Sequence, residues 1–226
     1  WTHFGNTNDI SNFSDIQPVI YGDQLWLLGK ALDQEQPITI VKLSSNGSWE
    51  RLTPKPQYKD TLSAAMEGHE VVVFDDKIWV VGNSRCALGN NTTEDSTFDC
   101  NQIYHTKDGL NWTSVTTTQN IMSHRGYTSM TEFNGKVWMT GGYHSNHWSE
   151  VAYSENGETW TKTNIQSNSF APRTGHQLVE FNDSMWLIGG STQPGINSQV
   201  ASASLKNDVW RSSDGKTWEL QLENAP

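Results

Sequence analysis

Residues 173–190 read RTGHQLVEFNDSMWLIGG, and this stretch decides the fold. The alternating segment 177–181 is followed by Asn182-Asp183, the apolar segment 185–188 and two glycines. Alternation of apolar and polar residues indicates a β-strand, and Asn-Asp between two such segments indicates a tight hairpin turn. The stretch therefore predicts two antiparallel strands that end at a pair of glycines.

The same pattern occurs three more times along the chain. Residues 125–142, RGYTSMTEFNGKVWMTGG, align with residues 173–190 without a gap. Their turn is Asn134-Gly135, a pair that suits a type I′ hairpin because both central residues need positive φ. Residues 68–83 and 18–30 carry weaker versions, each with one glycine after the second strand. We number the four repeats 1 to 4 in chain order.

A second hairpin follows the first in each repeat, and each hairpin has its own tryptophan. In three repeats it reads Thr/Ser-x-Asp/Asn-Gly-x-x-Trp, and in repeat 1 it is shorter, Ser44-Ser-Asn-Gly-Ser-Trp49. Spacings within each tryptophan series run from 48 to 63 residues, the period of a propeller blade rather than of a helical repeat. The two series are Trp26, Trp79, Trp138, Trp186 and Trp49, Trp112, Trp160, Trp218.

Two antiparallel hairpins per repeat predict an all-β fold, a β-propeller of four-stranded antiparallel blades. The 226 residues are expected to form a single propeller domain. The repeats are expected at about 13–53, 66–116, 125–164 and 173–222.

Residues 1–12 suggest an outer strand of a further blade, because Trp1 lies in phase with Trp49. The chain is then a part of a larger propeller, or a set of blades completed by another chain. A four-bladed ring with an irregular N-terminal segment is the alternative. An open array would expose two blade faces and favour self-association.

The glycine pair after the second strand, the aromatic residue that follows it, and the Arg-x-Gly-His lead-in at Arg173 resemble kelch repeats. The resemblance covers residues 13–222 and implies a kelch-type, galactose-oxidase-like propeller. The hairpin at Ser212–Trp218 is similar to the Asp-box of sialidases, shortened by one residue. In that family the box is a structural hairpin, which implies a structural role here.

Composition limits the partners. The net charge is −10 with 15 Lys and Arg, which argues against a nucleic-acid or anionic-membrane surface. No segment approaches the roughly 20 apolar residues of a membrane helix. Cys86 and Cys100 lie in one polar insertion, where a loop-closing disulfide would indicate a secreted or periplasmic protein. Two unrelated thiols in a reducing cell are the alternative.

The loops that enter the first strand and join the second and third strands of a blade emerge at the same end. The insertions 83–102 and 191–207 are expected there, and loops of varied length on one face are typical of a binding face. We therefore predict ligand contact by a group of basic and aromatic residues in these loops. They are Arg125, Arg173, His124, Tyr143, His144, His147 and Trp148.

Other roles are open for some of these residues. The resemblance implies that arginines such as Arg173 either brace neighbouring blades or face a ligand. His144 and His147 have a spacing that suits a metal, but a site needs a third ligand, and we predict no metal and no cofactor. His69 and His176 occupy equivalent positions at a strand entry, which favours a structural role.

Three functions compete. The first is an extracytoplasmic binding module that recognises a glycan or a protein on its loop-rich face, supported by Tyr143 and Trp148. The second, implied by the resemblance, is a sugar-active enzyme such as a sialic-acid mutarotase-like isomerase, with Arg125 or Arg173 holding the carboxylate. A copper-radical oxidase is disfavoured because both cysteines lie in one insertion. An intracellular kelch adaptor is disfavoured by the expected disulfide. Activity as an enzyme is left open, with binding preferred.

Overall fold

The computed structural model describes residues 13–31, 38–58, 62, 68–83, 101–115, 126–143, 149–192 and 204–225. In this part of the chain, sixteen strands form four antiparallel sheets of four strands each. A single-turn 3-10 helix, η2 (Pro56–Tyr58), follows the first sheet. The all-β fold of propeller type, with four four-stranded blades, is confirmed. The chain divides into two compact units, Trp1–Thr116 and Thr117–Pro226. The single propeller domain that the sequence predicts for all four repeats stays a prediction.

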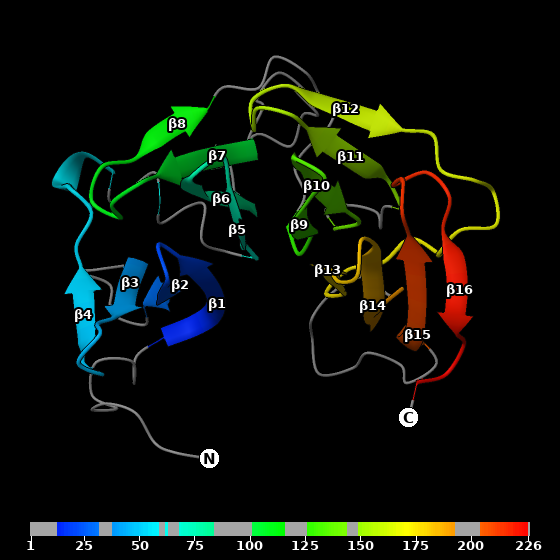
Figure 1. Cartoon of the computed structure of the whole chain (residues 1–226), viewed down its shortest axis with the longest axis horizontal. Coiled ribbons are helices and arrows are strands. Elements are labelled where there is room, and N and C mark those ends of the chain that lie inside the picture. Colours follow the sequence, from blue (N-terminus) through cyan, green and yellow to red (C-terminus); the bar gives the residue numbers. More distant parts are fainter. Residues whose placement is uncertain are drawn as a thin grey trace, which may run out of the picture. The chain divides into compact units, whose positions relative to one another are not determined.

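Each unit holds two blades, and within each blade strands that are neighbours in sequence pair antiparallel (Figure 1). We call the strands of a blade a to d in chain order. Blade 1 consists of β1 (Phe13–Tyr21), β2 (Gln24–Ala31), β3 (Ile38–Leu43) and β4 (Trp49–Leu52). Blade 2 consists of β5 (Glu70–Phe74), β6 (Lys77–Asn83), β7 (Asn101–Thr106) and β8 (Thr113–Val115).

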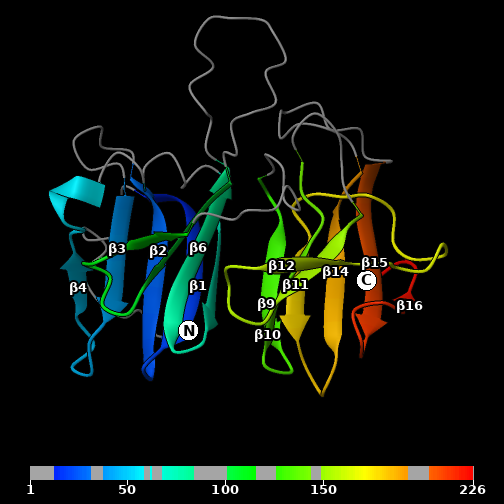
Figure 2. The same ribbon diagram turned by 90° about the horizontal axis from the view of Figure 1, so that it is seen from above.

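The second unit repeats this order, and Figure 2 shows the strands of the blades from a second direction. Blade 3 consists of β9 (Ser129–Phe133), β10 (Lys136–Thr140), β11 (Val151–Ser154) and β12 (Trp160–Thr163). Blade 4 consists of β13 (Gln177–Glu180), β14 (Met185–Ser191), β15 (Leu205–Ser212) and β16 (Glu219–Leu222).

The a–b turns have the backbone that the sequence predicts. Both central residues of every turn have positive φ, as a type I′ hairpin requires. The strand-b tryptophan then donates its Nε1–H to the carbonyl of the residue five positions earlier, at 2.8–3.1 Å, which closes each turn. The turn pairs are Gly22-Asp23, Asp75-Asp76, Asn134-Gly135 and Asn182-Asp183.

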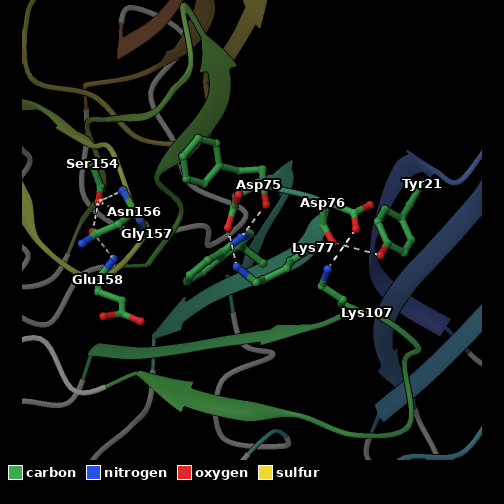
Figure 3. A network of polar contacts seen from close by, with 11 residues as sticks. Tyr21, Asp75, Asp76, Lys77, Lys107, Ser154, Asn156, Gly157 and Glu158 are labelled. Atoms are coloured by element: carbon green, nitrogen blue, oxygen red, sulfur yellow. Dashed lines mark hydrogen bonds and ion pairs between the residues drawn. The ribbon is translucent and has the colours of Figure 1, made fainter.

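The c–d hairpins of blades 2, 3 and 4 share one hydrogen-bond pattern, drawn for blade 3 in Figure 3. Ser154 Oγ accepts the N–H of Gly157 at 2.8 Å, and Asn156 Oδ1 accepts the N–H groups of Glu158 and Thr159. In blade 2, Asp108 takes the place of Asn156. Burial alone would raise the pKa of Asp108, but hydrogen bonds, first among them the one from the Asn111 N–H, lower it to about 2.

Neighbouring blades within a unit pack a tryptophan against a hairpin glycine. A Cβ atom placed on Gly215 of blade 4 would lie 2.0 Å from Cζ3 of Trp138 in blade 3. In the other unit, a Cβ atom on Gly109 of blade 2 would lie 3.0 Å from Cζ3 of Trp26 in blade 1. Only a residue without a side chain fits beneath these rings. The glycine of the hairpin motif is therefore required by packing as well as by its φ.

We call the end of a blade at which its a–b turn lies the turn end. At the turn end of unit 1, a hydrogen bond joins blade 1 to blade 2 (Figure 3). Tyr21 Oη of blade 1 donates to the backbone carbonyl of Asp76 in blade 2 at 3.0 Å, and within blade 2 Lys107 Nζ lies 2.9 Å from Asp76 Oδ2. Burial and the nearby Asp76 carboxylate raise the pKa of Tyr21. The a–b turn of blade 2 thus holds the last residue of β1.

Candidate functional site

Strand b ends and strand c begins at the same end of each blade, which we call the loop end. The a–b turns at the opposite end all have two central residues. The b–c connections at the loop end differ widely in length. They lie between Ala31 and Ile38, Asn83 and Asn101, Thr140 and Val151, and Ser191 and Leu205. Variation between blades is therefore concentrated at the loop end.

In unit 2 the loop end is fixed by backbone bridges on both blades. Gly126 and Tyr143 exchange N–H···O bonds of 3.0 and 2.9 Å, and Thr174 and Ser191 exchange bonds of 3.0 and 2.9 Å. Tyr143 is half-buried. These bridges extend the a–b pairing beyond the named strands and hold the first residues of the b–c connections in place.

Arg173, a predicted ligand contact, lies at the strand entry of blade 4 and is only 1% exposed. Its NH1 and NH2 groups donate to Asp208 Oδ1 and Oδ2 at 2.6 and 2.9 Å, a bidentate ion pair. NH1 also donates to the Gly189 carbonyl at 2.8 Å, and Nε donates to the Ala171 carbonyl at 3.1 Å. The guanidinium therefore ties the strand entry to the end of β14 and to β15.

Asp208 is held by a second donor, because Trp210 Nε1 donates to its Oδ2 at 2.8 Å. Burial alone would raise the pKa of Asp208, but the hydrogen bonds from Arg173 and Trp210 lower it. The carboxylate thus stays charged beside Arg173. These contacts use four of the five guanidinium N–H groups, and all of them are to blade 4 or to the segment that leads into it.

His176 is 1% exposed, and its Nε2 lies 2.7 Å from Thr140 Oγ1 of blade 3. A Cβ atom on Gly141 would lie 2.4 Å from Cε1 of His176, so the first glycine of the pair after β10 makes room for this ring. Burial, and then the positive charge of Arg173, lower the pKa of His176 to about 3. The ring is neutral at physiological pH and packs between blades 3 and 4, which agrees with the predicted structural role.

We expect His176 to make unfolding sensitive to pH. Because its folded-state pKa is about 3 and its ordinary pKa is 6.5, its contribution to stability is complete above pH 6.5 and is lost as pH falls toward 3. Blade 3 has a threonine, Thr128, at the position of His176, so His176→Thr is the substitution to make. Between pH 5.5 and 4 it should reduce the slope of the free energy of unfolding against pH by up to about 1.4 kcal/mol per pH unit.

Urea unfolding at a series of pH values measures that slope. The variant should also be less stable than wild type at pH 7.5, because it loses the packed ring. Equal slopes for the two proteins would contradict a neutral, buried His176.

All seven predicted ligand contacts stay predictions. The structure brings Arg173 and Tyr143 to the loop end of unit 2, on neighbouring blades. The other predicted residues lie outside the described part of the chain. These are His124, Arg125, His144, His147 and Trp148, together with the cysteines Cys86 and Cys100.

Sequence reasoning missed Asp208, the partner of Arg173. A signal for it was present. In blade 4, Asp208 stands three residues before Arg211, the strand-c residue that pairs with Trp186. In blade 3, Glu150 stands three residues before Tyr153, the strand-c residue that pairs with Trp138. An acidic residue thus recurs at this position in the two repeats that begin with an arginine.

Within the described ranges, no group of three or more His, Cys, Asp or Glu residues could hold a metal ion. None of the helices found there is long and apolar enough to span a membrane. Comparison with models of known protein families gives no match, and comparison with curated proteins gives none either.

Proposed function

We propose that this chain is a kelch-like, extracytoplasmic binding module that holds a glycan at the loop end of its blades. The observation that carries the proposal is the contrast between the two ends of the blades. Every a–b turn has the same two-residue form, whereas the b–c connections range from residues 32–37 in blade 1 to residues 84–100 in blade 2. Variable loops on a repeated, rigid scaffold are typical of ligand-binding faces.

The framework beneath this end supports binding because it is fixed before any ligand arrives. In unit 2 the bridges at Tyr143 and Ser191 and the ion pair between Arg173 and Asp208 hold the bases of both b–c connections. A preorganised site loses less conformational entropy when a ligand binds. The arrangement suits recognition by loops whose ends are held firmly.

The residues at the loop end favour a glycan as the ligand class. Tyr143 leads into a connection that contains His144, His147 and Trp148. Aromatic rings offer an apolar face with a polar edge, which suits a sugar ring that has both apolar C–H and polar hydroxyl groups. A protein ligand is the competing class. Because Arg173 is already paired with Asp208, the carboxylate-holding role proposed for it in an isomerase has no support from these contacts.

The extracytoplasmic location rests on the cysteine pair. A disulfide between Cys86 and Cys100 would close the long b–c insertion of blade 2 and restrict it. Titration of the denatured, unreduced protein should give no free thiol. Two free thiols per chain would contradict the proposed location and would leave glycan binding to be judged separately.

Glycan binding is tested with the labelled full chain on a glycan array, followed by titration with the best glycan. We expect Tyr143→Ala to weaken binding by about tenfold, equivalent to about 1.4 kcal/mol. Tyr21→Ala is the matched control, since Tyr21 is also half-buried but lies at the turn end of its blade. Thermal unfolding of both variants checks that they fold.

Two outcomes would contradict the proposal. The first is a glycan whose binding is lost in Tyr21→Ala and kept in Tyr143→Ala, which would place the site at the turn end. The second is the absence of glycan binding combined with a protein ligand whose binding Tyr143→Ala weakens. That result would keep the loop end as the site and replace the ligand class.

A further inference from the structure

Tyr127, which lies two residues before β9 in blade 3, has a strained backbone. Its φ is +57°, in the left-handed region. Every other non-glycine residue with positive φ in the described part of the chain is Asp or Asn, whose short polar side chains tolerate this region. A tyrosine in this conformation costs free energy, and such residues occur mainly at binding sites and active sites.

The contacts that hold this conformation use only the backbone of Tyr127. Its carbonyl accepts hydrogen bonds from the N–H of Gly175 and from Thr174 Oγ1, each at 3.2 Å, and these bonds join blade 3 to blade 4. A glycine in the place of Tyr127 would accept both bonds and would adopt the positive φ without strain. The link between the two blades therefore gives no reason for a tyrosine side chain here.

Blade 4 has a glycine at this position. The alignment of residues 125–142 with residues 173–190 matches Tyr127 with Gly175, and their φ values are +57° and +62°. A Cβ atom placed on Gly175 would meet no atom within 4 Å. A side chain at this position of the repeat is thus not required to fill the blade. Tyr127 is itself only half-buried.

Tyr127 lies at the loop end of blade 3, next to the bridge that holds Tyr143. The residue before it, Gly126, exchanges N–H···O bonds of 3.0 and 2.9 Å with Tyr143. Residues paired in this way have Cα atoms roughly 5.5 Å apart, so the backbone of Tyr127 is one residue away from the partner of Tyr143. Two half-buried tyrosines are therefore anchored on the two strands that this bridge joins.

We propose that Tyr127 contacts the glycan directly and forms, with Tyr143, the aromatic part of the site. The inference rests on the proposed function, because it adds a residue to the same site. The strained backbone is then the cost of placing a large ring where blade 4 has no side chain. A tyrosine offers an apolar ring face to the C–H groups of a sugar and a hydroxyl group to its polar groups.

Tyr127→Gly tests the inference, since it keeps the backbone contacts and removes the ring. The variant should unfold in urea at the same concentration as the wild type or at a higher one, because relief of the strain offsets the lost contacts of the ring. Its affinity for the glycan selected on the array, measured by isothermal titration with the free glycan, should fall by about tenfold or more. Weaker binding without lower stability is expected of a residue that contacts the ligand.

Asp183→Gly is the matched control. Asp183 has a φ of +53° and lies in the a–b turn of blade 4, at the turn end of the same unit. This change also removes a side chain from a left-handed residue. It should leave the affinity for the glycan unchanged.

NMR of the chain labelled with 13C in its tyrosine rings measures contact directly. The signal that is missing from Tyr127→Gly identifies the ring of Tyr127. In the complex we expect cross-peaks between the protons of this ring and those of the sugar.

The outcomes distinguish this inference from the proposed function. Wild-type affinity in Tyr127→Gly, together with weakened binding in Tyr143→Ala, would overturn the role of Tyr127 and keep the site. A Tyr127→Gly variant that loses stability as well as affinity, in a complex without cross-peaks from Tyr127 to the sugar, would also overturn it, because the ring would then act through the fold. A wild-type chain that binds no glycan would contradict both proposals.

Discussion

Gly215→Ala is expected to lower the free energy of unfolding by about 3–5 kcal/mol, the sum of an overpacked contact and a strained backbone. The added Cβ atom would lie 2.0 Å from Cζ3 and 2.4 Å from Cη2 of Trp138. The ring has little room to move, because Trp138 is 5% exposed and its Nε1 donates to the carbonyl of Phe133. The substitution therefore has to separate blade 3 from blade 4.

Gly135→Ala is the matched control for this prediction. Gly135 has a φ of +68°, close to the +71° of Gly215, but no atom lies within 4 Å of the position of its Cβ. The control therefore carries only the backbone cost, about 1 kcal/mol. Urea unfolding of both variants gives the comparison. Equal losses would show that Trp138 does not pack on Gly215.

Arg173→Met is expected to lower the free energy of unfolding by about 3–5 kcal/mol, because it leaves a charged carboxylate without its cation in a largely buried place. The Asp208 side chain is 14% exposed, and after the substitution it keeps the hydrogen bonds from Trp210 and from its own backbone N–H. The carbonyls of Gly189 and Ala171 also lose their donors. Methionine keeps much of the apolar stem of the arginine, so the loss reports mainly on charge and hydrogen bonds.

The double variant Arg173→Met/Asp208→Asn separates the ion pair from packing. Asparagine removes the unpaired charge and keeps an oxygen that can accept from Trp210, so the double variant should be more stable than Arg173→Met alone. Lys162→Met breaks the exposed pair with Glu150 and should change stability by less than about 1 kcal/mol. A loss from Arg173→Met as small as that of Lys162→Met would contradict a structural role for the ion pair between Arg173 and Asp208.

Local sequence patterns predicted the parts of the fold that depend on neighbouring residues. A type I′ turn needs positive φ at two adjacent positions, and Asn134-Gly135 and Asn182-Asp183 indicate it directly. The Asp-Gly of the c–d hairpin at Asp214 is recognisable for the same reason. The spacing of the tryptophans then gave the four repeats, because each repeat has one ring in each hairpin.

The candidate site was harder to predict, because its contacts join residues far apart in the sequence. Arg173 and Asp208 are 35 positions apart, and the insertion between their strands hides their relation. The sequence alone left two roles for Arg173, and neither of them was an ion pair with an acidic residue of the same blade.

The most direct test of this account is the NMR spectrum of the chain labelled with 13C at its glycines. A tryptophan ring shifts protons that lie over its face to higher field. We expect such shifts for the α-protons of Gly109 and Gly215, and ordinary positions for those of Gly22. Ordinary positions for Gly109 and Gly215 would contradict the packing of each tryptophan on the next blade's hairpin glycine.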